Sequence, residues 1–402
     1  MKTVADFNFQ NEKVLLRVDF NVPLNSRFQI TDNSRIKAAI PTIQHILNQG
    51  GAVILMSHLG RPKNGPEDAF SLKHIVEEVQ NLLNTTVHFV TETIGKNAEN
   101  AAKNLQSGEV LLLENLRFNP QETQGDLHFA EELSKLGTFY VNDAFGAAHR
   151  THASTAIIAQ FFNTKKCFGF LMANEINNAR KLMQNPERPF TAIVGGAKVS
   201  DKLLIIENLM NIANNILIGG GMAYTFAKAL GGNIGQSLCE ENRIDLCKAL
   251  IAKAKEKNVN LVLASDSITA NKFAEDAHTL TEPNHLISEG YMGLDIGPES
   301  IKHFTAIIEN SKSVLWNGPM GVFELKPFSM GTYAVAKALK KVTQNGGYTL
   351  IGGGDSAAAI HQFGLTNDVS FVSTGGGALL EIFEGKVLPG INAIENSQTR
   401  TP

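Results

Sequence analysis

Short runs of apolar residues alternate with amphipathic stretches along the whole chain. In the first half, such runs lie at 14–18, 52–56, 110–113 and 138–141. The second half repeats the scheme with runs at 190–194, 216–218, 260–263, 313–316, 348–351 and 369–372. Near-continuous apolar runs of this length indicate strands buried on both faces, as in parallel sheets covered by helices. The pattern predicts an α/β fold with amphipathic helices between the strands.

Two of the expected helices have sequence features of their own. The helix over 32–47 opens with an Asp/Asn/Ser cap and contains Pro41, which we expect to kink it. A second helix-like stretch, 172–183, separates the two halves and ends at the Pro-containing segment 185–189. At 402 residues the chain is too long for one ordinary core and suits two domains. We therefore expect a domain boundary and a hinge at this stretch.

Composition narrows the class of protein. Hydrophobic residues make up 43% and charged residues 19% of the chain, and a net charge of -3 argues against nucleic acid as a partner. Three cysteines, Cys167, Cys239 and Cys247, are too few for a disulfide framework and lack zinc-site spacing. Residues 1–13 carry no apolar signal core, and no segment approaches the ~18 apolar residues of a membrane span. We expect a cytoplasmic protein with no membrane partner.

Arg and His residues follow the expected strands of the first half. They are Arg35, His58 and Arg61 in the segment 58–62, Arg117, and His149, Arg150 and His152 in the segment 149–152. Guanidinium groups bind compact anions through bidentate hydrogen bonds. The Arg and His residues of any one segment could simply be exposed to solvent. Four such segments at equivalent strand ends favour a site that binds an anion. Asp19 and Asn21 could bind a polar ligand, or could form an Asx turn before Pro23.

Glycine runs take the equivalent places in the second half, at 195–196, 219–221, 352–354 and 375–377. Such runs let a backbone approach a polyphosphate or a nucleotide. The segment 198–202, which carries Lys198 and Lys202, is expected to open a helix that binds phosphate, or else to be a turn before a solvated helix. No P-loop motif occurs.

The run that begins at Gly352 fits the dinucleotide fingerprint G-x-G-x-x-A. A dehydrogenase would need a carboxylate at the end of the next strand, where this chain has Ser373 and Thr374. The sequence therefore argues against a dehydrogenase. Asp355 instead suits a magnesium ligand beside nucleotide phosphates.

Eight motifs, in one order along the chain, resemble those of the phosphoglycerate kinase family. They lie at 17–23 (RVDFNVP), 56–62 (MSHLGRP), 113–118 (LENLRF), 141–145 (VNDAF), 195–199 (GGAKV), 316–324 (WNGPMGVFE), 352–356 (GGGDS) and 373–378 (STGGGA). The resemblance covers nearly the whole chain. It implies a glycolytic phosphotransferase with a carboxyl group as acceptor, EC 2.7.2.3, which transfers a phosphoryl group reversibly from 1,3-bisphosphoglycerate to ADP, giving 3-phosphoglycerate and ATP.

The resemblance also implies two Rossmann-like α/β domains, each a parallel sheet flanked by helices, joined by a hinge helix. On this basis residues 1–172 would bind phosphoglycerate, 173–188 would form the hinge, and 189–384 would bind nucleotide. Residues 385–402 would return to the first domain. A monomer that closes by hinge bending and uses Mg²⁺ with ADP or ATP is expected.

The family's functional residues map onto matching positions of this chain. Substrate binding would fall to Asp19, Phe20, Asn21, Arg35, His58, Leu59, Gly60, Arg61, Arg117, His149, Arg150 and His152. Nucleotide binding would fall to Gly195, Gly196, Lys198, Lys202, Gly219, Gly220, Asn317, Pro319, Glu324, Gly353, Gly354, Asp355 and Ser356, with Asp355 as the metal ligand. Catalysis would involve Arg35, Lys202 and Gly376.

Two segments depart from the family pattern. The segment 263–271 has Ala264 and Asn271 where the family usually has Pro and Asp, and Ala147 replaces a usual Thr. Neither change removes an expected phosphate contact. The alternative function is a catalytically silent nucleotide-binding protein on the same fold, which a coupled ADP-forming assay would distinguish.

Overall fold

The chain folds into two compact units. The computed structural model describes residues 1–63 and 65–396. Among the described residues, unit 1 comprises Met1–Asn177 and 387–396, and unit 2 comprises Asn178–Lys386. The last residues of the expected return segment 385–402 lie outside the described part of the chain. The division falls within one helix, α6 (Phe170–Gln184). The hinge expected at 173–188 stays a prediction.

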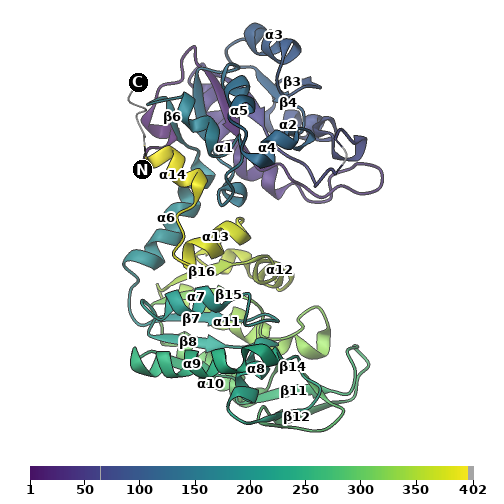
Figure 1. Cartoon of the computed structure of the whole chain (residues 1–402), viewed down its shortest axis with the longest axis vertical. Coiled ribbons are helices and arrows are strands. Elements are labelled where there is room, and N and C mark those ends of the chain that lie inside the picture. The colour runs from purple at the N-terminus through teal and green to yellow at the C-terminus, as the bar shows by residue number, and fades with distance from the viewer. Residues whose placement is uncertain (64, 397–402) are drawn as a thin grey trace. The chain divides into compact units, whose positions relative to one another are not determined.

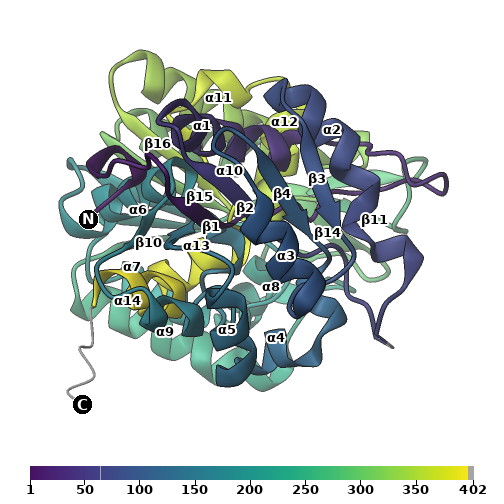
Figure 2. The same ribbon diagram turned by 90° about the horizontal axis from the view of Figure 1, so that it is seen from above.

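Unit 1 is built on a six-stranded parallel sheet in the order β3-β4-β2-β1-β5-β6. Its strands are β1 (Lys13–Arg17), β2 (Ala52–Met56), β3 (Val87–Val90), β4 (Val110–Leu113), β5 (Phe139–Asn142) and β6 (Lys166–Phe168). Figure 2 shows β1, β2, β4 and β3 side by side. Every residue of β2 and β4 is buried, as their continuous apolar sequences predict.

The helices of unit 1 besides α6 are α1 (Ser34–Asn48), α2 (Val76–Leu83), α3 (Lys96–Asn104), α4 (Pro120–Gln124), α5 (Leu127–Ser134) and α14 (Pro389–Glu395). Single 3₁₀ turns lie at Val4–Asp6, Asp68–Phe70, Leu72–Ile75, Leu116–Phe118, Phe145–Ala147 and Ile157–Phe161. Helix α1 runs through Pro41. Its Ile36 and Ile43 pack on Leu16 and Val53 of the sheet, which forms the main core of this unit. Helix α14 lies beside β6 (Figure 1), and Gly390 N donates to Ala148 O at 2.9 Å.

Unit 2 has a second six-stranded parallel sheet, in the order β10-β8-β7-β15-β16-β17. Its strands are β7 (Phe190–Val194), β8 (Asn215–Ile218), β10 (Asn260–Leu263), β15 (Ser313–Asn317), β16 (Tyr348–Gly352) and β17 (Phe371–Val372). Its helices are α7 (Leu203–Leu209), α8 (Met222–Ala229), α9 (Ile244–Glu256), α10 (Pro298–Glu309), α11 (Met330–Gln344), α12 (Gly354–Gln362) and α13 (Gly376–Phe383), with 3₁₀ turns at Glu241–Arg243, Lys326–Phe328 and Thr366–Asp368. Trp316 and Leu339 lie fully buried in its main core. The two sheets confirm the expected α/β fold.

A small antiparallel sheet in unit 2 was not predicted. It joins β12 (Thr279–Pro283), β11 (Asp266–Ala270) and β14 (Met292–Ile296). A two-stranded parallel ladder, β9 (Asn233–Ile234) with β13 (Leu286–Ile287), lies in the same part of the sequence. In the described part of the chain, no helix has the length and apolarity needed to cross a membrane.

Candidate functional site

Arg35 and Asp19 form an ion pair at the carboxyl end of the first sheet. Arg35 lies at the start of α1, and its Nη1 is 2.7 Å from Asp19 Oδ2. The Arg35 side chain keeps 40% exposure, whereas that of Asp19 keeps 13%. Asp19 Oδ1 also accepts a hydrogen bond from Asn21 N at 3.3 Å, as an Asx turn does. The carboxylate therefore sits in the turn and orients a guanidinium that solvent and ligands can reach.

The loop after β2 is held by three hydrogen bonds from neighbouring loops. Asn21 Oδ1 accepts from Gly60 N at 2.8 Å, and Arg117 Nη1 donates to Gly60 O at 2.8 Å. Asn115 Nδ2 donates to Leu59 O at 2.8 Å. Because these contacts fix the backbone, the loop presents its side chains in a defined geometry.

Two of the predicted substrate residues turn their side chains into the core. Phe20 is fully buried and Leu59 nearly so. Phe20 N donates to Ser57 Oγ at 2.9 Å. A role for either residue in binding would therefore come from the backbone.

The two histidines His58 and His152 are buried among cations. His58 Nδ1 lies 3.2 Å from Arg17 Nη2. Burial, followed by the charges of Arg17, Arg117 and Arg35, lowers the pKa of His58 well below its usual range. Burial and the same kind of cationic surroundings lower the pKa of His152 to about 4. Both imidazoles are therefore neutral at physiological pH.

Three arginines line a cavity of about 310 Å³ in unit 1: Arg61, Arg117 and Arg150. Burial, then repulsion by Arg17 and Arg150, lowers the pKa of Arg117 to about 10, so its guanidinium stays charged. Arg150 Nε donates to His149 Nε2 at 3.1 Å. A cavity lined by guanidinium groups has the donors that a phosphate or carboxylate group needs.

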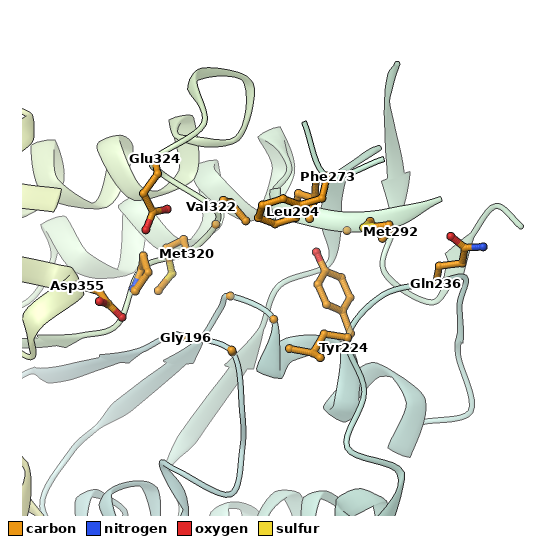
Figure 3. Close-up of a pocket in the computed structure, with 17 residues that line it drawn as sticks. Gly196, Tyr224, Gln236, Phe273, Met292, Leu294, Met320, Val322, Glu324 and Asp355 are labelled. Carbon is orange, nitrogen blue, oxygen red and sulfur yellow. The ribbon is translucent and has the colours of Figure 1, made fainter. Parts of the chain in front are cut away.

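Unit 2 holds a larger cavity, of about 530 Å³, above the carboxyl ends of β7, β8 and β15. It is lined by Gly196, Ala197, Gly220, Gly221, Tyr224, Gln236, Leu238, Phe273, Met292, Gly293, Leu294, Pro319, Met320, Gly321, Val322, Glu324 and Asp355. Figure 3 shows Asp355 and Glu324 toward one end and Gln236 at the other, with apolar side chains between them. An apolar slot with carboxylates at one end suits a flat ring joined to a charged chain.

Glycines bring three loops into close contact beside this cavity. A Cβ added at Gly195 would lie 2.1 Å from the carbonyl oxygen of Pro319. Gly220 has φ +68°, and a Cβ there would lie 2.6 Å from the backbone N of Gly196. Side chains at these places would push the loops apart, so the glycines shape the cavity wall.

Lys202 lies among polar groups from two strand ends. Its Nζ hydrogen-bonds Asn317 Oδ1, and Asn317 Nδ2 donates to Gly352 O at 2.7 Å. Burial lowers the pKa of Lys202, partly opposed by the negative charge of Asp355. Helix α7 starts at Leu203 and has Lys202 as its N-cap, so the segment 198–202 precedes the helix and ends in a turn. This matches the alternative of a turn before the helix, and phosphate binding by the segment stays a prediction.

The N-termini of α12 and α13 lie next to each other. A Cβ added at Gly376, the first residue of α13, would lie 3.7 Å from the backbone N of Gly354, the first residue of α12. Asp355 follows Gly354 and is exposed at the cavity. Ser356 is buried, and its Oγ accepts from Gly318 N at 2.6 Å, so its side chain braces the loop and a role in nucleotide binding would come from its backbone.

Several lining residues were not found from the sequence. Tyr224 of α8, Leu238, Phe273 and Leu294 of β14 belong to no glycine run or charged motif. They reach the cavity through the small antiparallel sheet and the segments around it. Tyr224 is fixed by a 2.8 Å hydrogen bond between its hydroxyl and Ser267 Oγ.

The metal expectation can be checked against the donor groups present. Among residues 1–63 and 65–396, no cluster of three or more His, Cys, Asp or Glu side chains could hold a metal ion. Asp355 lies at the cavity as an exposed carboxylate, as does Glu324. That donor set fits a Mg²⁺ that takes its other ligands from nucleotide phosphates and water.

Two parallel-sheet units, one with an arginine-lined cavity and the other with a cavity of glycine backbone and apolar side chains, are typical of an α/β phosphotransferase. A family model described as phosphoglycerate kinase matches residues 4–386. The phosphoglycerate kinase of Porphyromonas gingivalis is 48% identical over 98% of this chain and 100% of its own length, and that of Herpetosiphon aurantiacus is 49% identical over 98% and 99%. The solved structure of the Coxiella burnetii phosphoglycerate kinase matches with TM-score 0.90 at 38% identity, over 98% of each chain.

The chain belongs to the phosphoglycerate kinase family. Its activity is reversible phosphoryl transfer between 1,3-bisphosphoglycerate and ADP, EC 2.7.2.3, a reaction of glycolysis. The resemblance read from the motifs is thereby confirmed.

Proposed function

We propose that unit 1 binds phosphoglycerate on its basic residues and that unit 2 binds ADP or ATP in its cavity. The observation that carries this assignment is the difference between the two cavities. Arg61, Arg117 and Arg150 line the first, whereas glycine backbone and apolar side chains line most of the second. Phosphoglycerate is a small trianion and needs the arginine-lined cavity of unit 1. The base and ribose of the nucleotide need the apolar cavity of unit 2.

Within unit 1, the three arginines of the cavity bind the phosphate group of phosphoglycerate. Arg35, held by Asp19, lies at the carboxyl end of the substrate, where the phosphoryl group is transferred. Neutral His58 donates a hydrogen bond without adding charge. Phosphoglycerate is therefore bound by charge at one end and oriented by hydrogen bonds at the other.

Within unit 2, the base and ribose occupy the apolar slot, with Glu324 toward the ribose. The phosphates extend toward Asp355, Lys202 and the N-termini of α12 and α13. Helix N-termini bind phosphate through free N–H groups and the helix dipole. Asp355 and the nucleotide phosphates would hold Mg²⁺, which would supply neutralising charge.

The reaction requires charge stabilisation rather than a general base. The attacking or leaving carboxylate has an ordinary pKa near ~4 and is ionised at neutral pH. Negative charge spreads over the phosphoryl oxygens as they pass between donor and acceptor. Arg35 from the phosphoglycerate side, and Lys202 with the Gly376 amide from the nucleotide side, stabilise that charge.

The two substrates react when the units close on each other about the segment 173–188. Closure also excludes water, which would hydrolyse the acyl phosphate. The protein acts as a cytoplasmic monomer; free Cys167, Cys239 and Cys247 suit a reducing compartment. Small-angle scattering with both substrates should give a smaller radius than with either alone. Equal radii in all states would contradict closure.

The site assignment is tested by separate calorimetric titrations of two variants. Arg61→Ala should weaken 3-phosphoglycerate binding and leave ADP–Mg²⁺ binding unchanged. Asp355→Asn should do the reverse and raise the Mg²⁺ concentration needed for half-maximal activity. If either variant changed the binding of the other substrate instead, the assignment would be wrong.

A further inference from the structure

A buried carboxylate, Glu122 of α4, lies within the basic cluster of unit 1. Its side chain is buried, and its charge partly offsets the lowering of the Arg117 pKa. Its Oε1 is 3.8 Å from His152 Nδ1. Guanidinium groups gathered in a partly buried place repel one another, and a buried countercharge reduces that cost. Glu122 is not among the residues expected to touch substrate.

Ser154 connects Glu122 to Arg17. Arg17 Nε donates to Ser154 Oγ at 2.9 Å, and Ser154 Oγ is 2.6 Å from Glu122 Oε1. Ser154 N also donates to Glu122 Oε2 at 3.0 Å. A guanidinium can donate only and a carboxylate can accept only, so the serine hydroxyl must accept from Arg17 and donate to Glu122. The direction of each hydrogen bond from Arg17 through Ser154 to Glu122 is therefore fixed.

The other end of Arg17 sets the protonation of His58. Arg17 Nη2 lies 3.2 Å from His58 Nδ1, and Nη1 donates to Val18 O. Because the guanidinium is the donor, Nδ1 must be an unprotonated acceptor. A neutral His58 then carries its proton on Nε2. The buried, cationic surroundings that lower the pKa of His58 favour this neutral form.

We propose that Glu122 and Ser154 are positioning residues for the phosphoglycerate site, acting through Arg17 to hold His58 as the Nε2–H tautomer. This inference rests on the proposed function, which places His58 at the substrate. Nε2–H is then a hydrogen-bond donor of fixed direction for an anionic oxygen of phosphoglycerate. The other tautomer would turn a lone pair toward that oxygen and repel it.

The tautomer can be measured without any ligand. In protein labelled with ¹⁵N-histidine, the His58 ring resonances, assigned with His58→Gln, should show protonation at Nε2 alone. Ser154→Ala removes the acceptor for Arg17 and should give a tautomer mixture, whereas Ser154→Thr keeps the hydroxyl and should restore the parent spectrum. Ser154→Cys, close in size but a poor acceptor, gives the same test if the alanine variant does not fold.

A matched control is Ser311→Ala in unit 2. Ser311 is buried, and its hydroxyl pairs with Thr191 Oγ1 at 2.7 Å, so the substitution likewise removes a buried, hydrogen-bonded hydroxyl. It should leave the His58 resonances unchanged. A Ser154→Ala spectrum identical to the parent's would overturn the proposal.

Kinetics test the link to the substrate. Ser154→Ala should raise KM for 3-phosphoglycerate about tenfold, the effect of losing one hydrogen bond to a charged group, and leave KM for ATP unchanged. Equal rises in both KM values would indicate general loosening and contradict the proposal. If Arg61→Ala weakens phosphoglycerate binding but Ser154→Ala does not, the positioning role is wrong and the proposed substrate site stands. Normal phosphoglycerate binding by Arg61→Ala would instead refute the proposed site itself.

Discussion

Replacing Lys202 with methionine should separate activity from stability. Methionine matches the length of the lysine stem but removes the charge and the hydrogen bond to Asn317 Oδ1. In the proposed mechanism, this charge contacts the phosphoryl group during its transfer. Losing one such transition-state contact costs about 3 kcal/mol, which is about 150-fold in kcat/KM.

The same substitution should leave the free energy of unfolding unchanged or increase it, although it lowers activity. Burial lowers the pKa of Lys202, which means that the folded protein disfavours the charged amine relative to the unfolded chain. At pH values below the usual lysine pKa, burial of the charged amine therefore lowers the free energy of unfolding. Removing the charge therefore relieves a desolvation cost, and the free energy of unfolding at neutral pH should stay equal or rise.

A coupled ADP-forming assay and urea unfolding measure the two quantities on the same preparations. Lys228→Met is the matched control, because Lys228 is an exposed lysine of α8 in the same unit. Lys228→Met should change neither kcat/KM nor the free energy of unfolding. The reasoning would be refuted by a Lys202→Met enzyme with kcat/KM within about threefold of the parent, or by one that lost activity because it unfolded.

Three further substitutions test other parts of the account. Arg35→Ala should slow single-turnover phosphoryl transfer by about 150-fold, the effect of one lost contact of about 3 kcal/mol, and a parental rate would reject its role. The pKa of His152 is lowered to about 4, so between that value and its ordinary 6.5 the unfolded chain binds more protons and stability falls as the pH drops. In urea unfolding near pH ~5, His152→Asn should therefore lose about 2 kcal/mol less of its free energy of unfolding than the parent does. Curves of unfolding free energy against pH that run parallel for the two proteins would contradict this. Gly195→Ala places a Cβ 2.1 Å from Pro319 O and should destabilise the protein by about 1–3 kcal/mol and weaken ADP binding, whereas an unchanged Tm shift with ADP would count against it.

Most strands of the two main sheets were predictable from sequence because they are buried on both faces, but β3 and β6 of the first sheet were not predicted. Strands such as β2 and β7 consist of residues that are all buried, so a plain apolar run marks them. The small antiparallel sheet gave no such signal. Its strand β12 carries the exposed and half-buried sequence TLTEP, which resembles a loop. Its existence depends on pairing with β11 rather than on its own composition.

The charged part of the candidate site was more predictable than its apolar part. Arg61 and Arg117 stand out as basic residues at strand ends, and the structure places both at one cavity. Tyr224 and Leu294 look like ordinary core residues, and it is tertiary packing that turns them toward the nucleotide-type cavity. Glu122 could not have been found, because its importance comes from the cations that surround it in three dimensions.

A crystal structure with 3-phosphoglycerate and a magnesium complex of a non-transferable ATP analogue is the most direct measurement. The account predicts phosphoglycerate against Arg61, Arg117 and Arg150 of unit 1. It predicts the nucleotide base against Leu294 in the cavity of unit 2, with Asp355 at the metal. Both ligands bound on one unit, or phosphoglycerate away from the arginines, would contradict it.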